Sequence, residues 1–194
     1  MKLSLKFSVV VFALTFLYTL PGCGQIKSRP SDAQEPYFSF YALKAYTLEG
    51  DTVDFSQFKG KKVLIVNTAS KCGYTHQYAE LQKLHETHGD KVVILAFPSN
   101  DFFNQEPGNS AEIREFCTST FGVTFQMMEK VNVKGKGQHP VYEWLSSAER
   151  NGWNDQAPKW NFCKYLINEE GQLLKFFPSG ITPMGFEITE AINK

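Results

Sequence analysis

In this 194-residue chain, Cys72 has a side chain and a position that suit a nucleophile. The apolar run from Val63 to Val66 predicts a buried strand just before it. A helical pattern follows, with Thr75 in position to cap the helix and Gly89 to end it. A sulfur in the turn before a helix faces free N–H groups and the positive end of the helix dipole, which favour the reactive thiolate. We therefore interpret Cys72 as a nucleophile; the alternative is a small buried core residue.

The residues after Cys72 exclude one class of thiol chemistry. A local dithiol–disulfide centre needs a second cysteine three positions on, where this chain has Thr75. Apart from Cys23, which belongs to the N-terminal segment, the other cysteines are Cys117 and Cys163. Three cysteines at wide spacing do not make a structural disulfide framework. Any thiol that reacts with an oxidised Cys72 must come from a distant part of the chain.

Residues 1–22 have the pattern of an export signal. Lys2 and Lys6 precede an apolar run at 9–20 that is too short to span a bilayer comfortably. The run ends in LPGC, whose last residue is Cys23, and this resembles the lipobox of bacterial lipoproteins. The resemblance implies cleavage before Cys23, lipidation of its thiol and an exported protein anchored to a membrane. The alternatives are a simple secretory signal, which gives a soluble secreted or periplasmic protein, and an uncleaved membrane helix.

The rest of the chain has the length and composition of one domain. Residues 24–36 are polar, contain two prolines and show no apolar period, so we expect a lipidated Cys23 and a flexible tether before a domain at 37–194. The chain has 20 basic and 20 acidic residues and no basic stripe. Nucleic acid is therefore not expected as a partner.

Strand and helix patterns alternate through the domain. In the first half of the domain we expect a pair of short strands around a turn at 49–51, the strand before Cys72 with its helix, and a strand at 92–97. A helix opened by a capping box at Asn109 and Glu112 should follow. The remaining expected elements are a strand at 125–133, a helix at 139–149, a hairpin at 162–177 and a terminal helix from 185. This alternation predicts an α/β sandwich with a largely parallel centre. Cys72 falls at the carboxyl end of a strand, where sites gather in such sheets.

Three segments resemble the signature segments of the glutathione peroxidase family. They are NTASKCGYT at 67–75, FPSNDFFNQEPG at 97–108 and KWNF at 159–162, in the family's order, and the similarity runs from about residue 38 to the C-terminus. The resemblance implies a thioredoxin-like fold, a central mixed sheet flanked by helices, and reduction of peroxides by a cysteine. We expect no cofactor and no metal. The site that the resemblance implies consists of Cys72, Gln105, Trp160 and Asn161.

These residue types suit peroxide reduction, in which a thiolate attacks one oxygen and a hydroxide or alkoxide leaves. The indole N–H of Trp160 only donates, and the amides of Gln105 and Asn161 offer NH₂ donors. Donors aimed at the sulfur stabilise the thiolate, and donors aimed at the departing oxygen stabilise its charge. Taken alone, Trp160 would be a core aromatic and Gln105 a surface residue of a loop.

The chain departs from the family's common FPCNQF at two positions. Ser99 replaces a cysteine that is generally dispensable in thiol-dependent members, so we expect little effect. Asp101 replaces a glutamine and places a carboxylate near the site. Such a carboxylate either disfavours the thiolate, or points to solvent or caps a turn.

Cys117 lies in a segment that resembles the resolving-cysteine helix of thioredoxin-dependent, non-selenium members. The resemblance implies that its thiol condenses with a Cys72 sulfenic acid. The alternative is a core-facing cysteine, because Ile113, Phe116 and Cys117 share one helical face. A disulfide needs Cα atoms within about 7 Å, so we expect this helix to unwind locally during catalysis.

We therefore interpret the chain as an exported thiol peroxidase that reduces hydrogen peroxide and organic or lipid hydroperoxides. Cys72 becomes a sulfenic acid, Cys117 forms a disulfide with it, and a thioredoxin-like protein rather than glutathione reduces that bond. The short stretch between Trp144 and Trp160 lacks the insertion of tetrameric members, which predicts a monomer with an open site. The alternatives are a peroxide sensor or redox relay without substantial turnover, and a metal-delivery lipoprotein, against which the spacing of Cys72 and Thr75 argues.

Overall fold

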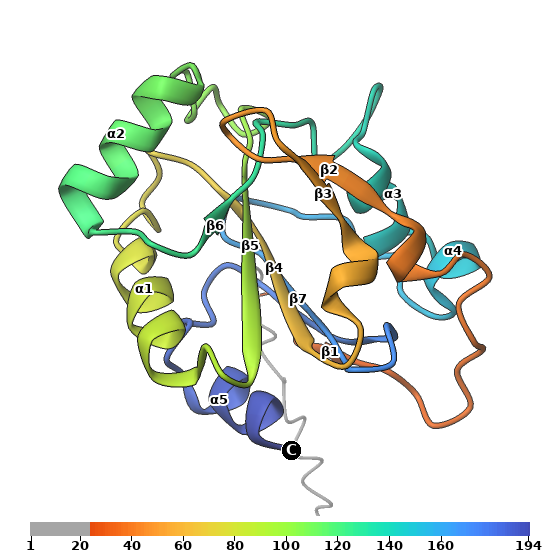
Figure 1. The fold of residues 1–194 in the computed structure, drawn as a ribbon. Helices are drawn as coiled ribbons and strands as arrows, with labels where there is room; N and C mark the ends of the chain where they lie inside the picture. The colour runs from red at the N-terminus through yellow and green to blue at the C-terminus, as the bar shows by residue number, and fades with distance from the viewer. Residues whose placement is uncertain (1–23) are drawn as a thin grey trace, which may run out of the picture.

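The computed structural model describes residues 24–194 and is built around a six-stranded sheet (Figure 1). In sheet order the strands are β1 (Lys27–Ser28), β8 (Leu173–Phe177), β7 (Lys164–Ile167), β4 (Lys62–Thr68), β5 (Val92–Pro98) and β6 (Gln126–Met127). Strands β4, β5 and β6 are parallel, whereas β7 is antiparallel to β4 and to β8, and β8 is antiparallel to β1. The mixed sheet is confirmed. The expectation of a largely parallel centre is wrong, because β4 has one parallel and one antiparallel neighbour.

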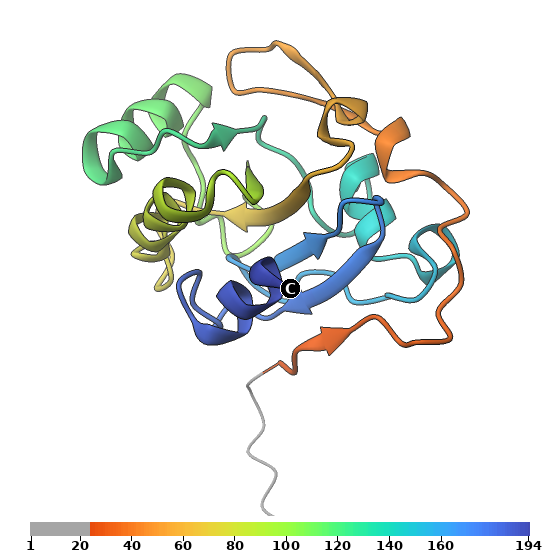
Figure 2. The same ribbon diagram turned by 60° about the horizontal axis from the view of Figure 1, so that its bottom comes forward.

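Other elements cover both faces of this sheet (Figures 1 and 2). One face carries α1 (Gln77–His88), α2 (Ser110–Phe121) and α5 (Phe186–Asn193). The opposite face carries α3 (Pro140–Leu145), α4 (Ala148–Asn151), the pair β2 (Lys44–Tyr46) and β3 (Thr52–Asp54), and the 3₁₀ turns η1 (Phe40–Ala42) and η2 (Phe55–Phe58). The strand pair, the hairpin of β7 and β8 and the terminal helix agree with the sequence-based expectation.

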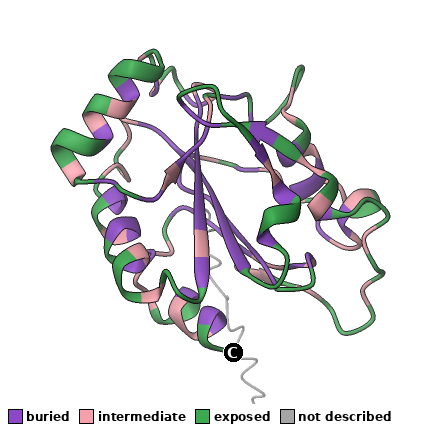
Figure 3. Cartoon of the chain, in the orientation of Figure 1, coloured by how far each residue is buried: buried purple, intermediate pink, exposed green. Residues whose placement is uncertain are grey.

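Strand β4 explains the apolar run before Cys72. Every residue of β4 is buried (Figure 3). Val63 and Ile65 pack into the core beneath the β2–β3 pair and α3, whereas Leu64 and Val66 pack into the core beneath α1, α2 and α5. A strand buried on both faces needs apolar residues at every position, so its sequence does not alternate.

Two predicted elements are shorter in the structure. Of the strand expected at 125–133, only the two residues of β6 pair as a strand. The chain after β6 contacts the sheet through single hydrogen bonds, such as the one from Val131 N–H to Pro98 O at 2.9 Å. The helix expected at 139–149 divides into α3 and α4. At the division the Ser146 hydroxyl donates to the Tyr142 carbonyl at 2.6 Å, and serine side chains that bond the backbone in this way compete with helix continuation.

The expectation of a flexible tether at 24–36 is wrong for its first half. Strand β1 pairs with β8, and the Arg29 N–H continues the pairing to Leu174 O at 2.7 Å. The Arg29 guanidinium also donates to the carbonyls of Ala33 and Gln34, at 3.3 and 2.9 Å. Backbone pairing with an edge strand needs no apolar period, so composition does not reveal it. The predicted signal at 1–22 and Cys23 lie outside the described residues.

Within residues 24–194, no helix combines the length and the apolar character that crossing a bilayer requires.

Candidate active site

Cys72 lies partly buried in a tight turn between β4 and α1. Its N–H donates to the Thr75 hydroxyl at 2.9 Å, the Thr75 N–H donates to Cys72 O at 3.0 Å, and the Thr75 hydroxyl donates to Ala69 O at 2.8 Å. Thr75 therefore closes the cysteine's own turn, whereas α1 begins at Gln77 and has no side-chain cap. The expectation that Thr75 caps the helix is wrong. The direct donor to Cys72 Sγ is the Tyr74 N–H, at 3.4 Å.

Gln105 and Asn161 form a pair beside this turn. The Lys71 N–H donates to Gln105 O at 3.0 Å, which joins the Cys72 turn to the loop after β5. The Asn161 side-chain amide donates to Gln105 Oε1, also at 3.0 Å. This bond uses the oxygen of Gln105, and no residue within 24–194 accepts from its NH₂ group. The pair thus presents a free amide donor.

Trp160 differs from the other two tryptophans. The indole N–H of Trp144 donates to Phe38 O, and that of Trp153 donates to Leu173 O, each at 2.7 Å. No group in the described chain accepts from the indole N–H of Trp160. An indole nitrogen is a donor only. Trp160 therefore carries the one indole donor that remains available to a ligand in residues 24–194.

The loops that hold these side chains are strained. Within the described chain, the non-glycine residues with positive φ are Phe103 and Asn104, both at 53°, and Phe162 at 64°. This conformation costs about 1–2 kcal/mol per residue. Two of these residues directly precede Gln105 and the third directly follows Asn161. Strain of this kind persists where the surrounding structure fixes a functional geometry.

Asn67 fixes the second of these loops, and sequence analysis assigned it no role. It is fully buried at the end of β4. Its side chain donates to Trp160 O at 3.0 Å and accepts from the Cys163 N–H at 3.1 Å, and its carbonyl accepts from the Phe162 N–H at 2.6 Å. The available signal was a polar amide at the end of an apolar strand, since a buried amide must find partners.

Asp101 caps a turn, as one of the two expectations had it. Its Oδ2 accepts from the N–H groups of Val133 and Lys134, at 2.6 and 3.2 Å. Ser99 is fully buried, and its hydroxyl accepts from the Asp101 N–H at 3.4 Å. These two departures from the family pattern thus stabilise the loop that carries Gln105.

Cys117 is fully buried within α2 and forms no bond with Cys72 in this structure. The predicted capping box is confirmed: the Asn109 side chain accepts from the Glu112 N–H at 3.0 Å, and the Asn109 N–H donates to Glu112 Oε2 at 2.8 Å. Burial raises the pKa of the Cys117 thiol to about 11, and the neighbouring Tyr78 hydroxyl opposes that rise. The intact helix therefore holds Cys117 as an unreactive thiol.

Cys163 is also buried, and it directly precedes β7. Its Sγ lies 3.5 Å from the Ser179 hydroxyl. The next residue, Lys164, donates to the Ile181 carbonyl and to the side-chain oxygen of Gln77, both at 2.5 Å. Burial lowers the pKa of Lys164 to about 7. These bonds hold the chain around Ser179 against the sheet, where it forms one wall of a groove.

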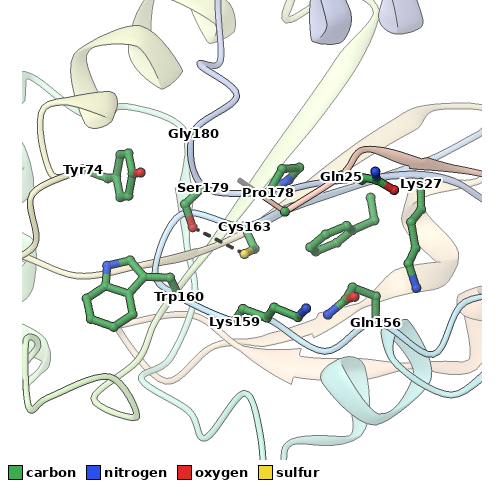
Figure 4. Close-up of a pocket in the computed structure, with 12 residues that line it drawn as sticks. Gln25, Lys27, Tyr74, Gln156, Lys159, Trp160, Cys163, Pro178, Ser179 and Gly180 are labelled. Atoms are coloured by element: carbon green, nitrogen blue, oxygen red, sulfur yellow. Dashed lines mark hydrogen bonds between the residues drawn. The ribbon is translucent and has the colours of Figure 1, made fainter. Parts of the chain in front are cut away.

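That groove, of about 700 Å³, runs beside Trp160 (Figure 4). Figure 4 shows Tyr74 and Trp160 near one end and Lys27 near the other. Cys72 does not line the groove, but Tyr74, whose N–H contacts its sulfur, does. Within residues 24–194 there is no cluster of three or more side chains suited to a metal ion.

Comparisons with known proteins identify the family of the chain. The family profile described as glutathione peroxidase matches residues 40–146. A glutathione peroxidase from Lactococcus lactis is 45% identical over 157 residues, which cover 80% of this chain and 98% of that protein. A glutathione peroxidase-like peroxiredoxin from Saccharomyces cerevisiae is 43% identical over 159 residues, with coverage of 80% and 98%.

Solved structures give the same result. The T. cruzi GPX1 structure superposes with a TM-score of 0.60 at 31% identity, covering 79% of this chain and 92% of that one. A thiol:disulfide interchange protein of the thioredoxin family from Chlorobium tepidum has a TM-score of 0.55 at 15% identity, with coverage of 84% and 99%, which bears on the fold alone. The thioredoxin-like α/β fold and the expectation of a peroxidase-family enzyme are confirmed. From its sequence, its fold and its relatives, this chain belongs to the glutathione peroxidase family.

Proposed function

We propose that the protein is a thiol peroxidase in which Cys72 reduces hydrogen peroxide and organic hydroperoxides. The Cys72 thiolate attacks one peroxide oxygen, the O–O bond breaks, and the second oxygen leaves as hydroxide or alkoxide and takes up a proton. The sulfur is oxidised to a sulfenic acid. The observation that carries this proposal is the pair of unused donors, on Trp160 and Gln105, beside the Cys72 turn.

These donors have the chemistry that the first step requires. A free indole N–H and a free amide stabilise negative charge on sulfur before the attack and on the departing oxygen during it. The bond from Asn161 to Gln105 Oε1, at 3.0 Å, sets which end of that amide is free. The Tyr74 N–H, at 3.4 Å from Cys72 Sγ, adds a donor that a side-chain substitution cannot remove.

The second step of the proposal forms a disulfide between Cys72 and Cys117. The sulfenic acid and the Cys117 thiol yield the disulfide and one water, and a thioredoxin-like dithiol protein then reduces the disulfide. Because Cys117 is fully buried in α2, this step requires part of that helix to unwind. Only Ile113 and Cys117 of the 12 residues in α2 are buried, which supports a low cost of opening.

Peroxide consumption by the purified protein tests the function and its electron donor together. We expect many turnovers with thioredoxin and its reductase, and slow turnover with glutathione. A peroxide sensor or redox relay would instead oxidise once per protein molecule and stop, so a stoichiometric end point with both reductants would contradict the peroxidase proposal.

The groove beside Trp160 supports organic hydroperoxides as substrates, and lipid hydroperoxides among them. Its walls include the rings of Tyr74, Trp160 and Phe176, and its volume of about 700 Å³ lies in the usual range for small-molecule sites. Gly24 and Gln25 also line it. A lipid attached at Cys23 would therefore bring the groove to a membrane surface, where lipid hydroperoxides arise. The protein is proposed to act there as a monomer.

Export and anchoring through Cys23 are part of this proposal. The substitution Cys23→Ala should abolish incorporation of radiolabelled palmitate and release the protein from membranes, while the purified variant keeps its peroxidase rate. Equal labelling of the wild type and the variant would contradict lipidation at Cys23. A simple secretory signal predicts no label in either protein.

A further inference from the structure

Glu106 is a buried carboxyl group with one oxygen unused. Its side chain has no exposed area. Oε1 accepts from the Ser70 hydroxyl at 2.7 Å, and the Glu106 N–H donates to Asn100 Oδ1 at 2.9 Å. No group within residues 24–194 bonds Oε2. A buried polar atom without a partner costs about 1–3 kcal/mol, so its retention calls for a reason beyond packing.

The position of Glu106 relates it to both reacting cysteines. It lines a cleft of about 540 Å³. Its lining includes Ser70 and Lys71, which directly precede Cys72, and also Ile113 and Phe116 of α2. Glu106 therefore lies in a cleft bordered both by the Cys72 turn and by the helix that carries Cys117.

The charges around Glu106 suit a group that takes up and returns a proton. Burial raises the pKa of its carboxyl group, the hydrogen bond from Ser70 opposes that rise, and the charges of Lys130 and Lys71 oppose it further. Glu112 faces the same cleft from α2. A carboxyl group whose pKa lies nearer to neutrality exchanges protons more effectively at physiological pH.

The Cys117 thiol needs a group that accepts its proton. On the intact helix its pKa is about 11, and about one thiol in ten thousand is ionised at neutral pH. Unwinding returns the thiol toward its ordinary pKa near 8.5, at which about 3% is thiolate at neutral pH. The Tyr78 hydroxyl, beside Cys117 in the folded state, cannot take this proton, because burial raises its pKa well above the ordinary value and keeps it protonated at neutral pH.

We propose that Glu106 accepts the proton of Cys117 when the disulfide forms and passes it to the oxygen that leaves Cys72. In this step the S–H bond of Cys117 and the S–O bond of the Cys72 sulfenic acid break, and the S–S bond forms. The proton moves from Cys117 to Glu106 and then to the departing hydroxide, which becomes water. Both electrons of the new bond come from the Cys117 sulfur. The inference rests on the proposed function and adds a residue to its second step.

The rate of disulfide formation as a function of pH tests this role. Wild type and the variants Glu106→Gln and Glu112→Gln would be oxidised with one equivalent of hydrogen peroxide, quenched at intervals with acid and analysed by peptide mass spectrometry. Glu106→Gln keeps an acceptor for Ser70 but removes the proton acceptor. Glu112→Gln is the matched control, because it removes a carboxylate from the same cleft and glutamine also serves in a capping box.

We expect the wild-type rate to rise with pH through the pKa of Glu106 and then to level off, because only the carboxylate form accepts a proton. Glu106→Gln should slow disulfide formation about 10- to 100-fold at neutral pH, and its rate should climb about tenfold per pH unit toward the thiol pKa. Glu112→Gln should follow the wild-type curve. Glu106→Asp, which keeps the carboxylate, should retain the wild-type shape at a lower rate and serves if the glutamine variant does not fold.

Two outcomes distinguish a failure of this inference from a failure of the proposed peroxidase function. In the first outcome, the wild type forms the Cys72–Cys117 linkage and Glu106→Gln has the same pH profile, at an equal or a lower rate. The proton-transfer role of Glu106 is then wrong, and the two-cysteine mechanism stands. If the wild type forms no such linkage, the proposed second step fails and the role of Glu106 fails with it.

Discussion

Two helices of equal length flank the candidate site, and they differ in how many of their residues are buried. Helix α1, which follows Cys72, has 12 residues, and five of them are buried. Helix α2, which contains Cys117, also has 12 residues, and only Ile113 and Cys117 are buried (Figure 3). The helix behind the attacking sulfur is thus fixed to the sheet by more buried residues than the helix that carries the proposed second thiol.

This difference suits the two steps of the proposed reaction. Attack on peroxide requires a fixed sulfur among fixed donors, because small displacements of reacting groups are costly in rate. Disulfide formation requires movement, since Cys117 is buried in an intact helix. Burial of Ile113 contributes about 1.5–3 kcal/mol and the Asn109 cap about 1 kcal/mol. Opening the first turn of α2, which ends at Ile113, therefore costs a few kcal/mol, which local fluctuations reach.

The largest effect should come from replacing Cys72, the attacking residue in the turn before α1. Cys72→Ser should abolish peroxide turnover, because a hydroxyl group lacks both the acidity and the polarisable attacking atom of a thiol. Peroxide consumption with thioredoxin measures this, and retention of the fold is checked by circular dichroism. A folded variant that still consumes peroxide would show that Cys72 is not the attacking residue.

A smaller loss should follow from removing one free donor. Trp160→Phe keeps an aromatic ring and removes the unused indole N–H, so the peroxide step should slow by about 10- to 1000-fold. Stopped-flow measurement of the first oxidation isolates that step. Trp153→Phe is the matched control: its indole N–H bonds Leu173 O, so its loss should lower thermal stability and leave the rate unchanged. Equal rates in both variants would argue against the donor role of Trp160.

The smallest effect should come from loosening α2. Asn109→Ala removes the cap and lowers helix stability by about 1 kcal/mol, which should speed disulfide formation about fivefold if opening of the helix limits it. The first oxidation should not change. Ser39→Ala removes a comparable cap from η1 and should have no effect on either step. Slower disulfide formation in Asn109→Ala would mean that the intact helix, rather than its opening, is required.

The sequence predicted the parts of the molecule that local patterns determine. The apolar runs of β4 and β5, the capping box at Asn109 and the turn between β7 and β8 are local features, and all are present. Gln105, Trp160 and Asn161 were named from the family resemblance. The structure adds the bond between Gln105 and Asn161, which are 56 positions apart. Their catalytic roles stay predictions.

What the sequence did not predict depends on contacts between distant residues. Asn67 bonds a carbonyl 93 positions away, and Ser70 bonds Glu106 across 36 positions. Strand β1 exists because an edge of β8 is available to it, and its polar residues give no strand pattern of their own. Thr75 had the right type for a helix cap, but its hydroxyl bonds within the Cys72 turn instead. Each of these depends on which partner the fold brings near.

The most direct test of the account is to oxidise the reduced protein with one equivalent of hydrogen peroxide and map its linkages by peptide mass spectrometry, with hydrogen exchange of α2 measured on the same sample. We predict a Cys72–Cys117 disulfide and faster exchange over 110–119, with α1 still protected. Cys117→Ser should react once, stall with thioredoxin, and over-oxidise at Cys72 in excess peroxide. A Cys117→Ser variant that cycles normally with thioredoxin, or a linkage to Cys163 instead, would contradict the two-cysteine mechanism.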